Sequence, residues 1–376
     1  MTHAQIIVGA PGDDLGQTVG ASPLYTWKEA RRARKLCENA VTTFSLQCID
    51  ACGEEGGVIR RADQNTVLSK STVNFTAQTL GDTLNDGQDA GRSQTIAGST
   101  TWRAGRFRWA VDAAAPVVVM GIVNVTPDSF SDGGQHNSTH SALLHAESLL
   151  AQGAQIVDIG GESTRPGAPK VAVQEELDRV LPVLAELAKR GHCVSIDTRK
   201  TEVMRAAIDA GADIINDVTA LADTGAVELC AAREVGVVLM HMQGSPGTMQ
   251  AAPRYVDVVR EVGDFLATRA LACEAAGMAR DRIVLDPGFG FGKAFEHNVE
   301  LTRRLSELVL RGYPVLAGWS RKRTLGTLTG RDVASERVYA SVAAALACVA
   351  QGARIVRVHD VAATVDALKV WRAFVA

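Results

Sequence analysis

Short apolar runs and helix-like stretches alternate eight times along the chain from Trp102 onward. The runs are rich in β-branched residues, as buried strands are, and the stretches between them carry apolar residues at i, i+3 and i+4. Gly153-Ala154, Gly211-Ala212 and Gly352-Ala353 each fall where a helix should end and the next strand begin. The expected strands are 117–124, 155–160, 193–197, 213–217, 236–241, 282–286, 314–318 and 354–358.

Eight strand–helix units in roughly 260 residues predict an α/β fold, the (β/α)8 TIM barrel, which typically takes about 250 residues. A doubly wound open sheet is the alternative, because it is built from the same alternation. Residues 102–111 alternate around Gly105 and predict a short hairpin ahead of the first unit. We expect Trp102, Phe107 and Trp109 of this hairpin to plug the N-terminal end of the barrel.

The first 101 residues lack this periodicity. Residues 63–101 are rich in Thr, Ser, Asn, Gln, Gly and Asp and hold few large apolar side chains, so they can bury too little surface to offset the entropy of ordering. We therefore divide the chain into an N-terminal extension over 1–101, disordered or loosely ordered and without a functional motif, and a barrel over 102–376.

Composition and charge narrow the class of protein. A net charge of −3 gives no indication of a nucleic-acid partner, and 46% hydrophobic with 22% charged residues is ordinary for a soluble protein. No apolar run approaches the length of a membrane span, and residues 1–30 lack the basic start and apolar middle of a signal peptide. We expect a cytoplasmic protein that binds neither nucleic acid nor a membrane.

The seven cysteines predict no metal site. Cys193, Cys230, Cys273 and Cys348 lie far apart in apolar or Ala-rich surroundings, which favours reduced thiols in the core. The other three, at positions 37, 48 and 52, have no paired His or Cys at zinc spacing.

Polar residues gather where the expected strands end. The first strand runs into Asn124-Val125-Thr126-Pro127-Asp128, where Pro127 removes a backbone donor and stops the ladder. In a parallel barrel all such ends open on one mouth, where enzymes of this architecture keep their chemistry. One buried Asp is usually a structural group, whereas polar clusters at so many strand ends predict an active site. The other clusters are Asp158–Gly167, Asp197–Lys200, Asn216-Asp217, Met240–Gly244, Asp286–Lys293, Gly318–Lys322 and Arg357–Asp360.

Two of these clusters invite an anion-binding interpretation. Arg357 and His359 are two residues apart on a strand, so they project to the same side and form an anion site at the eighth strand end. The Gly288–Lys293 run looks like a phosphate loop, but it fails the Walker pattern twice, at Pro287 and Ala294. Its alternating glycines instead favour a close approach of the backbone to a flat ring.

Four segments closely resemble the signatures of the dihydropteroate synthase family in order and spacing: Asn124–Gly134, Gly160–Gly167, Asp286–Lys293 and Ser320–Lys322. The resemblance covers about 102–376. It implies a transferase of folate biosynthesis that joins 6-hydroxymethyl-7,8-dihydropterin diphosphate to 4-aminobenzoate, giving 7,8-dihydropteroate and pyrophosphate. It also implies Mg²⁺ as cofactor, inhibition by sulfonamides and a homodimer. Arg199, where the family often has a smaller or uncharged residue, is a departure from the pattern.

The resemblance assigns the pterin pocket first. Asp197, Asn216 and Asp286 bind the donor–acceptor edge of the ring, and the two carboxylates also stabilise positive charge on it during reaction. Met240 and Phe291 cover the ring faces. Asp197, Asp286 and Lys322 are the implied catalytic residues, with Lys322 contacting the pterin and lining the aminobenzoate site.

The remaining implied residues handle the diphosphate and the second substrate. Asn124 is the metal-linked residue, and Mg²⁺ would bridge it to phosphate oxygens. Arg357 and His359 bind the leaving pyrophosphate. The loops Thr126–His136 and Ser163–Lys170 close over substrate, and their Asp132, Thr164 and Arg165 complete the aminobenzoate and pyrophosphate sites.

Two other functions remain open at this point. A pterin-binding methyltransferase on a related barrel would carry a methyl group from a folate to a corrinoid, and it would not need Asn124, Arg357 and His359. A non-catalytic paralogue would bind pterin or regulate a partner, and the presence of Asp197 and Lys322 argues against it.

Overall fold

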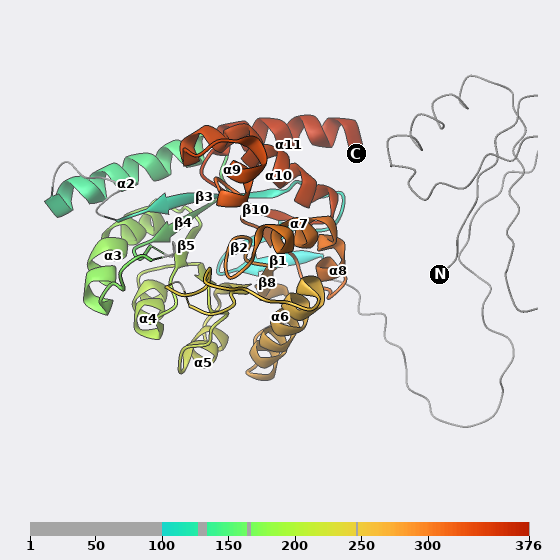
Figure 1. The fold of residues 1–376 in the computed structure, drawn as a ribbon. Helices are drawn as coiled ribbons and strands as arrows, with labels where there is room; N and C mark the ends of the chain where they lie inside the picture. The colour runs from blue at the N-terminus through green and yellow to red at the C-terminus, as the bar shows by residue number, and fades with distance from the viewer. Residues whose placement is uncertain (1–99, 127–133, 164–166, 246, 376) are drawn as a thin grey trace, which may run out of the picture. The chain divides into compact units, whose positions relative to one another are not determined.

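The computed structural model describes residues 100–126, 134–163, 167–245 and 247–375, with the backbone alone for 134–138 (Figure 1). The N-terminal extension predicted over 1–101 lies outside the described residues up to position 99.

Eight parallel strands form one sheet in the order β8-β7-β6-β5-β4-β3-β10-β9. The first and last strands of this order are joined by a bridge between Leu285 and Val315, and Leu285 N donates to Pro314 O over 2.9 Å. The sheet therefore closes on itself, which confirms the predicted TIM barrel and excludes the open doubly wound sheet. The strands are β3 (Val118–Asn124), β4 (Ile156–Gly160), β5 (Val194–Asp197), β6 (Ile214–Asp217), β7 (Gly236–Met240), β8 (Ile283–Asp286), β9 (Leu316–Ala317) and β10 (Ile355–Val358).

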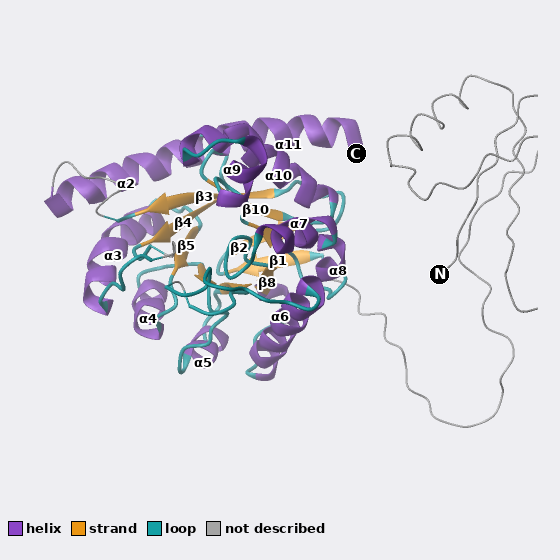
Figure 2. Cartoon of the chain, in the orientation of Figure 1, coloured by secondary structure: helices purple, strands orange, loops and turns teal. Residues whose placement is uncertain are grey.

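Helices surround these strands (Figures 1 and 2). The turns from helix to strand use glycine as predicted, because Gly153, Gly211 and Gly352 have φ of 104°, 104° and 102°, a conformation that other residues rarely adopt. The helices are α2 (Gly134–Ala151), α3 (Val173–Lys189), α4 (Thr201–Asp209), α5 (Ala226–Ala231), α6 (Val258–Ala275), α7 (Phe295–Arg303), α8 (Leu305–Val309), α9 (Arg323–Thr329), α10 (Val338–Ala350) and α11 (Val361–Val375), with short 3₁₀ turns η2 (Arg280–Arg282) and η3 (Ala334–Arg337).

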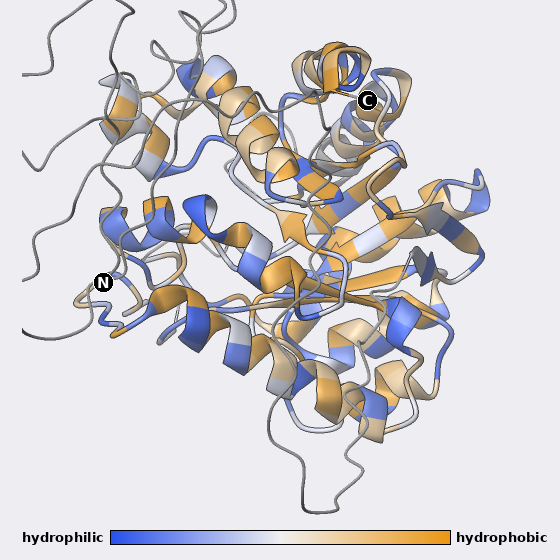
Figure 3. Cartoon of the chain, turned by 90° about the vertical axis from the view of Figure 1, so that its right-hand side faces the viewer, coloured by the Kyte–Doolittle hydropathy of each residue, from blue (hydrophilic) through white to orange (hydrophobic). Residues whose placement is uncertain are grey.

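Alternate residues of each strand serve two separate apolar cores. The strands of the barrel carry mostly hydrophobic residues, which Figure 3 colours orange. Val157 and Ile159 of β4 belong to the outer core, where the barrel packs against its helices. Ile156 of the same strand belongs to the inner core, together with Met120 and Ile214 of its neighbours. This period of two decides which strand residues can reach the interior of the barrel.

The predicted hairpin is confirmed as β1 (Thr101–Ala104) paired antiparallel with β2 (Phe107–Ala110). Trp102 is fully buried in the inner core, and its ring lies 4.9 Å from that of Trp109. A Cβ at Gly236, where β7 begins, would lie only 2.7 Å from Ala104 Cβ, so the glycine lets the hairpin approach the strand. The hairpin therefore plugs the N-terminal end of the barrel, and any site must open at the other end.

The four cysteines predicted to be core thiols, Cys193, Cys230, Cys273 and Cys348, are all free and buried. Burial raises the pKa of Cys230 and of Cys348 to about 12, so these thiols are unreactive. Across the described part of the chain, no single helix has the length and apolarity to cross a membrane, although one bent pair, Arg323–Thr329 with Ala334–Ala350, has both by length and composition alone.

Candidate active site

The inward positions of the strands change from apolar to polar on the way to the open end of the barrel. In β4, β6 and β8 the inner core residues Ile156, Ile214 and Val284 are each followed two positions later by a polar residue. The same phase brings side chains from several strands into one interior space. The inward polar residues are Asn124, Asp158, Asp197, Asn216, Asp286 and Arg357.

Arg357 on β10 joins two of the carboxylates. Its Nε lies 2.6 Å from Asp158 Oδ2, and its Nη2 lies 2.7 Å from Asp197 Oδ2. Burial lowers the pKa of the guanidinium, but Asp158 and Asp197 outweigh it and hold that pKa above its ordinary value. Arg357 therefore stays charged. No described residue accepts a hydrogen bond from its Nη1, which leaves donors available to a ligand.

Asp158 belongs to the polar cluster expected at the second strand end, where no role was predicted for it. It is fully buried, it receives Arg357, and its Oδ2 also accepts a hydrogen bond from Asn216 Nδ2 over 3.2 Å. The signal for it was an acidic residue at an inward position of a buried strand. Asp158 ties Arg357 and Asn216 together and so orients two predicted site residues.

Asp197 is poised to titrate near neutrality. Burial raises its pKa to about 7, the Arg357 charge acts in the opposite direction, and the neighbouring Asp158 adds to the rise. Asp286 lies on β8, three strands along from β5; it is buried, and Gly288 N donates to its Oδ1 over 2.7 Å. Burial raises the pKa of Asp286, against the Gly288 hydrogen bond and the nearby cations.

Lys322 and Phe291 line the wall next to Asp286. The Lys322 ammonium lies 4.1 Å from the centroid of the Phe291 ring, a cation–π contact. A Cβ at Gly290 would lie 3.3 Å from Lys322 Cδ, so the glycine leaves room for the lysine stem. Met240 is buried and is paired in register with Asp286. The structure thus brings together four residues that the sequence analysis placed in one pocket.

The glycines of the Gly288–Lys293 segment were expected to allow close approach of the backbone to a flat ring. In the structure they serve a different contact. A Cβ at Gly288 would lie 2.0 Å from His241 O, and one at Gly292 would lie 2.3 Å from Gln243 O. Both glycines also have positive φ, of 65° and 60°. The closest approach that they allow is therefore to the backbone of the loop after β7. A Cβ at Gly288 would also lie 3.2 Å from Met240 Cγ, so Gly288 and Gly290 both adjoin a predicted site residue.

Arg357 and His359 do not form a ready-made anion site of two free cations. Arg357 is engaged by carboxylates, and His359 Nδ1 lies 2.9 Å from Ser320 Oγ, to which His359 N also donates. Beside them, Arg321 and Asp360 form an ion pair with Nε and Oδ2 at 3.0 Å. The position of His359 is therefore held by Ser320, and its role with an anion stays a prediction.

Asn124 lies at the end of β3, paired in register with Gly160 of β4. A Cβ at Gly160 would lie 3.9 Å from Asn124 Oδ1 and 3.7 Å from Asp197 Cβ, so the glycine leaves the space between these two residues open. The described residues contain no cluster of three or more His, Cys, Asp or Glu that could hold a metal ion. With Asn124 as the candidate protein ligand, the site suits only a metal ion that takes most of its ligands from water and substrate, as Mg²⁺ does.

The predicted site residues Asp132, Thr164 and Arg165 lie outside the described residues. At the base of the second loop, Glu162 Oε1 receives Arg199 over 3.1 Å and its Oε2 receives Lys200 over 3.0 Å. Burial raises the pKa of Glu162, but the two cations hold it below its ordinary value. Arg199, the departure from the family pattern, therefore pairs with a loop carboxylate and leaves the inward residues unchanged.

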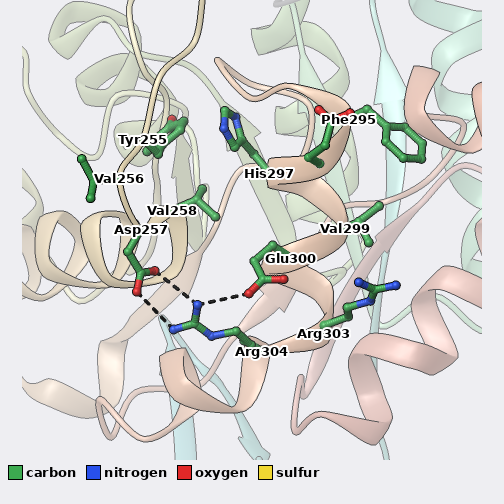
Figure 4. A pocket seen from close by; sticks show the side chains of 11 residues that line it. Tyr255, Val256, Asp257, Val258, Phe295, His297, Val299, Glu300, Arg303 and Arg304 are labelled. Carbon is green, nitrogen blue, oxygen red and sulfur yellow. Dashed lines mark hydrogen bonds and ion pairs between the residues drawn. The ribbon is translucent and has the colours of Figure 1, made fainter. Parts of the chain in front are cut away.

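A separate hollow of about 560 Å³ lies between the segment before α6 and helix α7 (Figure 4). Its Arg304 is neutralised by Asp257, at 3.3 Å, and by Glu300, at 3.1 Å. Tyr255 in its wall donates to Gly292 O over 2.8 Å. A residue in the wall of this hollow therefore contacts the loop after β8 from outside the barrel. None of the inward polar residues lines the hollow.

Comparison with known proteins agrees with this geometry. The family model described as pterin binding enzyme matches residues 120–359. The dihydropteroate synthase of Neisseria meningitidis serogroup B is 58% identical over 278 residues, covering 72% of this chain and 96% of that protein. The structure of Xanthomonas albilineans dihydropteroate synthase with 4-aminobenzoic acid is similar with a TM-score of 0.69 at 52% identity, over 74% of this chain and 99% of that one. The Burkholderia cenocepacia enzyme complexed with 7,8-dihydropteroate is similar with a TM-score of 0.67 at 48% identity, over 73% and 96%.

Proposed function

This chain belongs to the dihydropteroate synthases of the pterin-binding enzyme family, and we propose that the inward residues at its barrel mouth carry out their reaction. The enzyme is a transferase of folate biosynthesis. It joins 6-hydroxymethyl-7,8-dihydropterin diphosphate to 4-aminobenzoate and releases pyrophosphate. Its relatives are dihydropteroate synthases, which favours this activity over a methyltransferase or a non-catalytic paralogue.

The observation that carries the proposal is a pair of carboxylates, Asp286 buried and Asp197 half-buried, that face one interior space. Asp197 on β5 and Asp286 on β8 are separated by two strands, and Asn216 on one of these is held by Asp158. A dihydropterin presents N–H donors and ring acceptors along one edge, so carboxylates and an amide match it. Met240 and Phe291 cover the faces of the ring.

The bonding changes need few protein groups. The amine nitrogen of 4-aminobenzoate bonds to the exocyclic methylene carbon of the pterin, and the C–O bond to the diphosphate breaks. Pyrophosphate leaves with the electron pair of that bond, and the amine loses one proton. Asp197 and Asp286 stabilise positive charge that develops on the pterin as the C–O bond lengthens. Lys322, on the wall next to Asp286, contacts the pterin and borders the aminobenzoate site.

The diphosphate is bound at the ends of β3 and β10. Arg357 keeps Nε and Nη2 on the carboxylates, and its Nη1 donors turn to the phosphate oxygens, with His359 beside it. Mg²⁺ would be held by Asn124, water and the diphosphate itself, and when bound it supplies charge neutralisation for the leaving group. Asp132, Thr164 and Arg165 complete the aminobenzoate and pyrophosphate sites from the two loops. Sulfonamides would compete for the aminobenzoate site.

A homodimer is part of this proposal, with its contact surface on α9, η3 and α10. Leu328 on α9, Val333 just before η3 and Tyr339 on α10 are 59%, 53% and 84% exposed, and they offer this surface apolar contact area. Tyr339→Glu should shift the mass measured by sedimentation from dimer to monomer. The compartment proposed is the cytoplasm, where buried thiols such as Cys230 stay reduced.

The direct test of the activity is an assay of the purified full chain with both substrates, following 7,8-dihydropteroate by chromatography, with Mg²⁺ and with a chelator. We expect product with Mg²⁺ and little with the chelator. An absence of product with Mg²⁺ present would refute the enzymatic function.

A further inference from the structure

One buried cation near the pocket has no part in the reaction described above. Lys293 follows the glycine-rich segment, and it is only 2% exposed. Its ammonium lies 2.9 Å from His241 Nδ1 and within hydrogen-bond distance of three backbone carbonyls, at 3.2 Å from His241 O, 3.0 Å from Gly288 O and 3.0 Å from Phe291 O. Burying a charged group costs free energy. We therefore expect this lysine to have a role that an apolar side chain at the same position could not fill.

The four contacts connect the two loops that carry the wall of the pterin pocket. His241 directly follows Met240 at the end of β7, and its N donates to Asp286 O over 3.0 Å. Gly288 and Phe291 belong to the loop after β8, where Gly288 N also donates to Asp286 Oδ1. Lys293 therefore fixes the backbone on both sides of the carboxylate that binds the pterin edge.

The imidazole of His241 is an acceptor in this arrangement. Burial and the Lys293 charge lower the pKa of His241 to about 3, so the ring is neutral at physiological pH. Nδ1 must then accept from the ammonium, which places the ring proton on Nε2. Phe265 and Tyr255 pack around the ring, at 5.0 and 6.1 Å between centroids, and burial raises the pKa of the Tyr255 phenol, which stays neutral.

The charge of Lys293 also acts on Asp286. The cations that face this carboxyl are Lys322, Arg357 and Lys293, and each lowers a pKa that burial raises. Burial lowers the pKa of Lys293 itself to about 7, with Asp286 raising it and Lys322 lowering it. Below pH 7 the lysine is charged, which is the range in which a buried carboxyl would otherwise take up a proton. Asp197, which faces the same interior space, has a pKa raised to about 7 by burial. Cys348, a further titratable group near Asp286, stays protonated because burial raises its pKa to about 12.

We propose that Lys293 is a positioning residue of the pterin pocket, whose ammonium ties the loops after β7 and β8 together and keeps Asp286 ionised for binding. The inference rests on the proposed function in one respect, the binding of pterin by Asp286. Lys293 does not touch the substrate; it acts through Asp286, Gly288 and Phe291.

The test uses the full chain and a 7,8-dihydropterin that lacks the diphosphate, so that it requires neither turnover nor metal. Binding is measured by fluorescence from about pH 5 to 8 for the wild type, Lys293→Met and Lys293→Gln. Glutamine is neutral but keeps two N–H donors for the carbonyls, whereas methionine keeps neither charge nor donors. Lys369→Met is the matched control, because Lys369 lies on α11 and pairs only with Asp366.

We expect the affinity of the wild type to fall at acid pH as the two carboxyls of the pterin edge, Asp286 and Asp197, take up protons. In both Lys293 variants the midpoint of this fall should move upward, because Asp286 loses a neighbouring cation, so that affinity drops more near pH 6 than near pH 8. Lys369→Met should leave the midpoint unchanged. His241→Leu, which removes one acceptor and leaves the charge, should weaken binding equally at every pH.

An unmoved midpoint in Lys293→Gln and Lys293→Met would overturn the proposal and leave Lys293 with a purely mechanical role. Failure of both variants to fold, judged by circular dichroism, would also overturn it by placing the residue in the framework of the barrel. If the wild type binds no dihydropterin at any pH, the proposed function fails instead, so the two failures are distinguishable.

Discussion

Arg357 Nη2 lies 2.7 Å from Asp197 Oδ2, which joins β10 to β5 across the interior of the barrel. The contact places a charged guanidinium beside the carboxylate that is expected to bind the pterin edge, while other donors of the same group remain available to a diphosphate. We therefore expect Arg357 to act on both parts of the first substrate, on the pterin through Asp197 and on the diphosphate directly.

Replacement of Arg357 by Ala should affect both stability and binding. The change leaves Asp158 and Asp197 without their cation, and breaking a buried ion pair on one side typically costs about 3–5 kcal/mol. The melting temperature should therefore fall clearly. Arg372→Ala on α11, an exposed arginine, should leave it nearly unchanged.

Calorimetry on the folded Arg357→Ala protein tests its second effect. A charge-assisted hydrogen bond to phosphate is worth about 1.5–3 kcal/mol, so pterin diphosphate should bind at least about tenfold more weakly. A pterin without the diphosphate should lose much less. Equal weakening of both ligands would contradict the placement of Arg357 at the diphosphate.

The variants Asp197→Asn and Asp286→Asn test the pterin edge. Each keeps the shape of the side chain but replaces an acceptor-only carboxylate by an amide that also donates. We expect kcat/KM to fall by roughly 100-fold or more, because a preorganised charge is lost. Asp217→Asn is the control, since Asp217 is fully buried but accepts, among the described residues, only from Thr219 and Leu221. Near-normal activity in either test variant would show that its carboxylate is structural.

The raised pKa of Asp197, about 7, predicts a pH dependence of stability. An acid whose pKa is higher in the folded state than its ordinary value of about 3.9 is bound to its proton more tightly in that state. Its contribution to stability is therefore complete below about pH 4 and is lost as the pH rises through about 7. Urea unfolding of the wild type between about pH 5 and 8 should show this decline relative to Asp197→Asn. Parallel curves for the two proteins would contradict it.

The fold was predictable because buried strands and amphipathic helices alternate with little ambiguity. Every expected strand is present, and Gly153, Gly211 and Gly352 occupy the helix-to-strand turns that their left-handed conformation suits. β9 is the exception in length, with only Leu316–Ala317 in place of 314–318. Its pairing with β8 is a single bridge at Val315, a detail of barrel closure that depends on the neighbouring strand and not on local sequence.

The partners of the site residues were not predictable in the same way. The role of Asp158 depends on Arg357, which is 199 positions away in the chain, and no spacing rule connects them. The use of Gly288 and Gly292 to approach the loop after β7 depends likewise on where that loop lies. Resemblance to a family predicts which residues lie in the pocket. The groups that hold these residues in place are seen only in the folded barrel.

Removal of the metal gives a further prediction. Because the described residues offer no cluster of acidic ligands, Mg²⁺ should bind with the diphosphate and not before it. A chelator should abolish turnover while leaving the binding of a pterin without diphosphate unchanged. Asn124→Ala should raise the Mg²⁺ concentration needed for half-maximal rate. Tight Mg²⁺ binding to the protein alone, measured by calorimetry, would contradict this.

The N-terminal extension gives the next prediction. Its polar, aperiodic composition argues against a core of its own, so deletion of 1–99 should leave the melting temperature and the turnover nearly unchanged. Deletion of 1–110 is the matched comparison, because it also removes the hairpin and the fully buried Trp102. That longer deletion should destabilise the barrel strongly. Loss of folding in the shorter deletion would show that the boundary is wrong.

A crystal structure of the full chain with 7,8-dihydropteroate tests most directly the claim that the inward polar residues form the pterin pocket. We predict density for the pterin ring inside the barrel mouth, with its donor–acceptor edge on Asp197, Asn216 and Asp286 and its face beside Phe291 and Lys322. Density for the ring at any other place, with these three edge residues contacting only protein, would contradict the account.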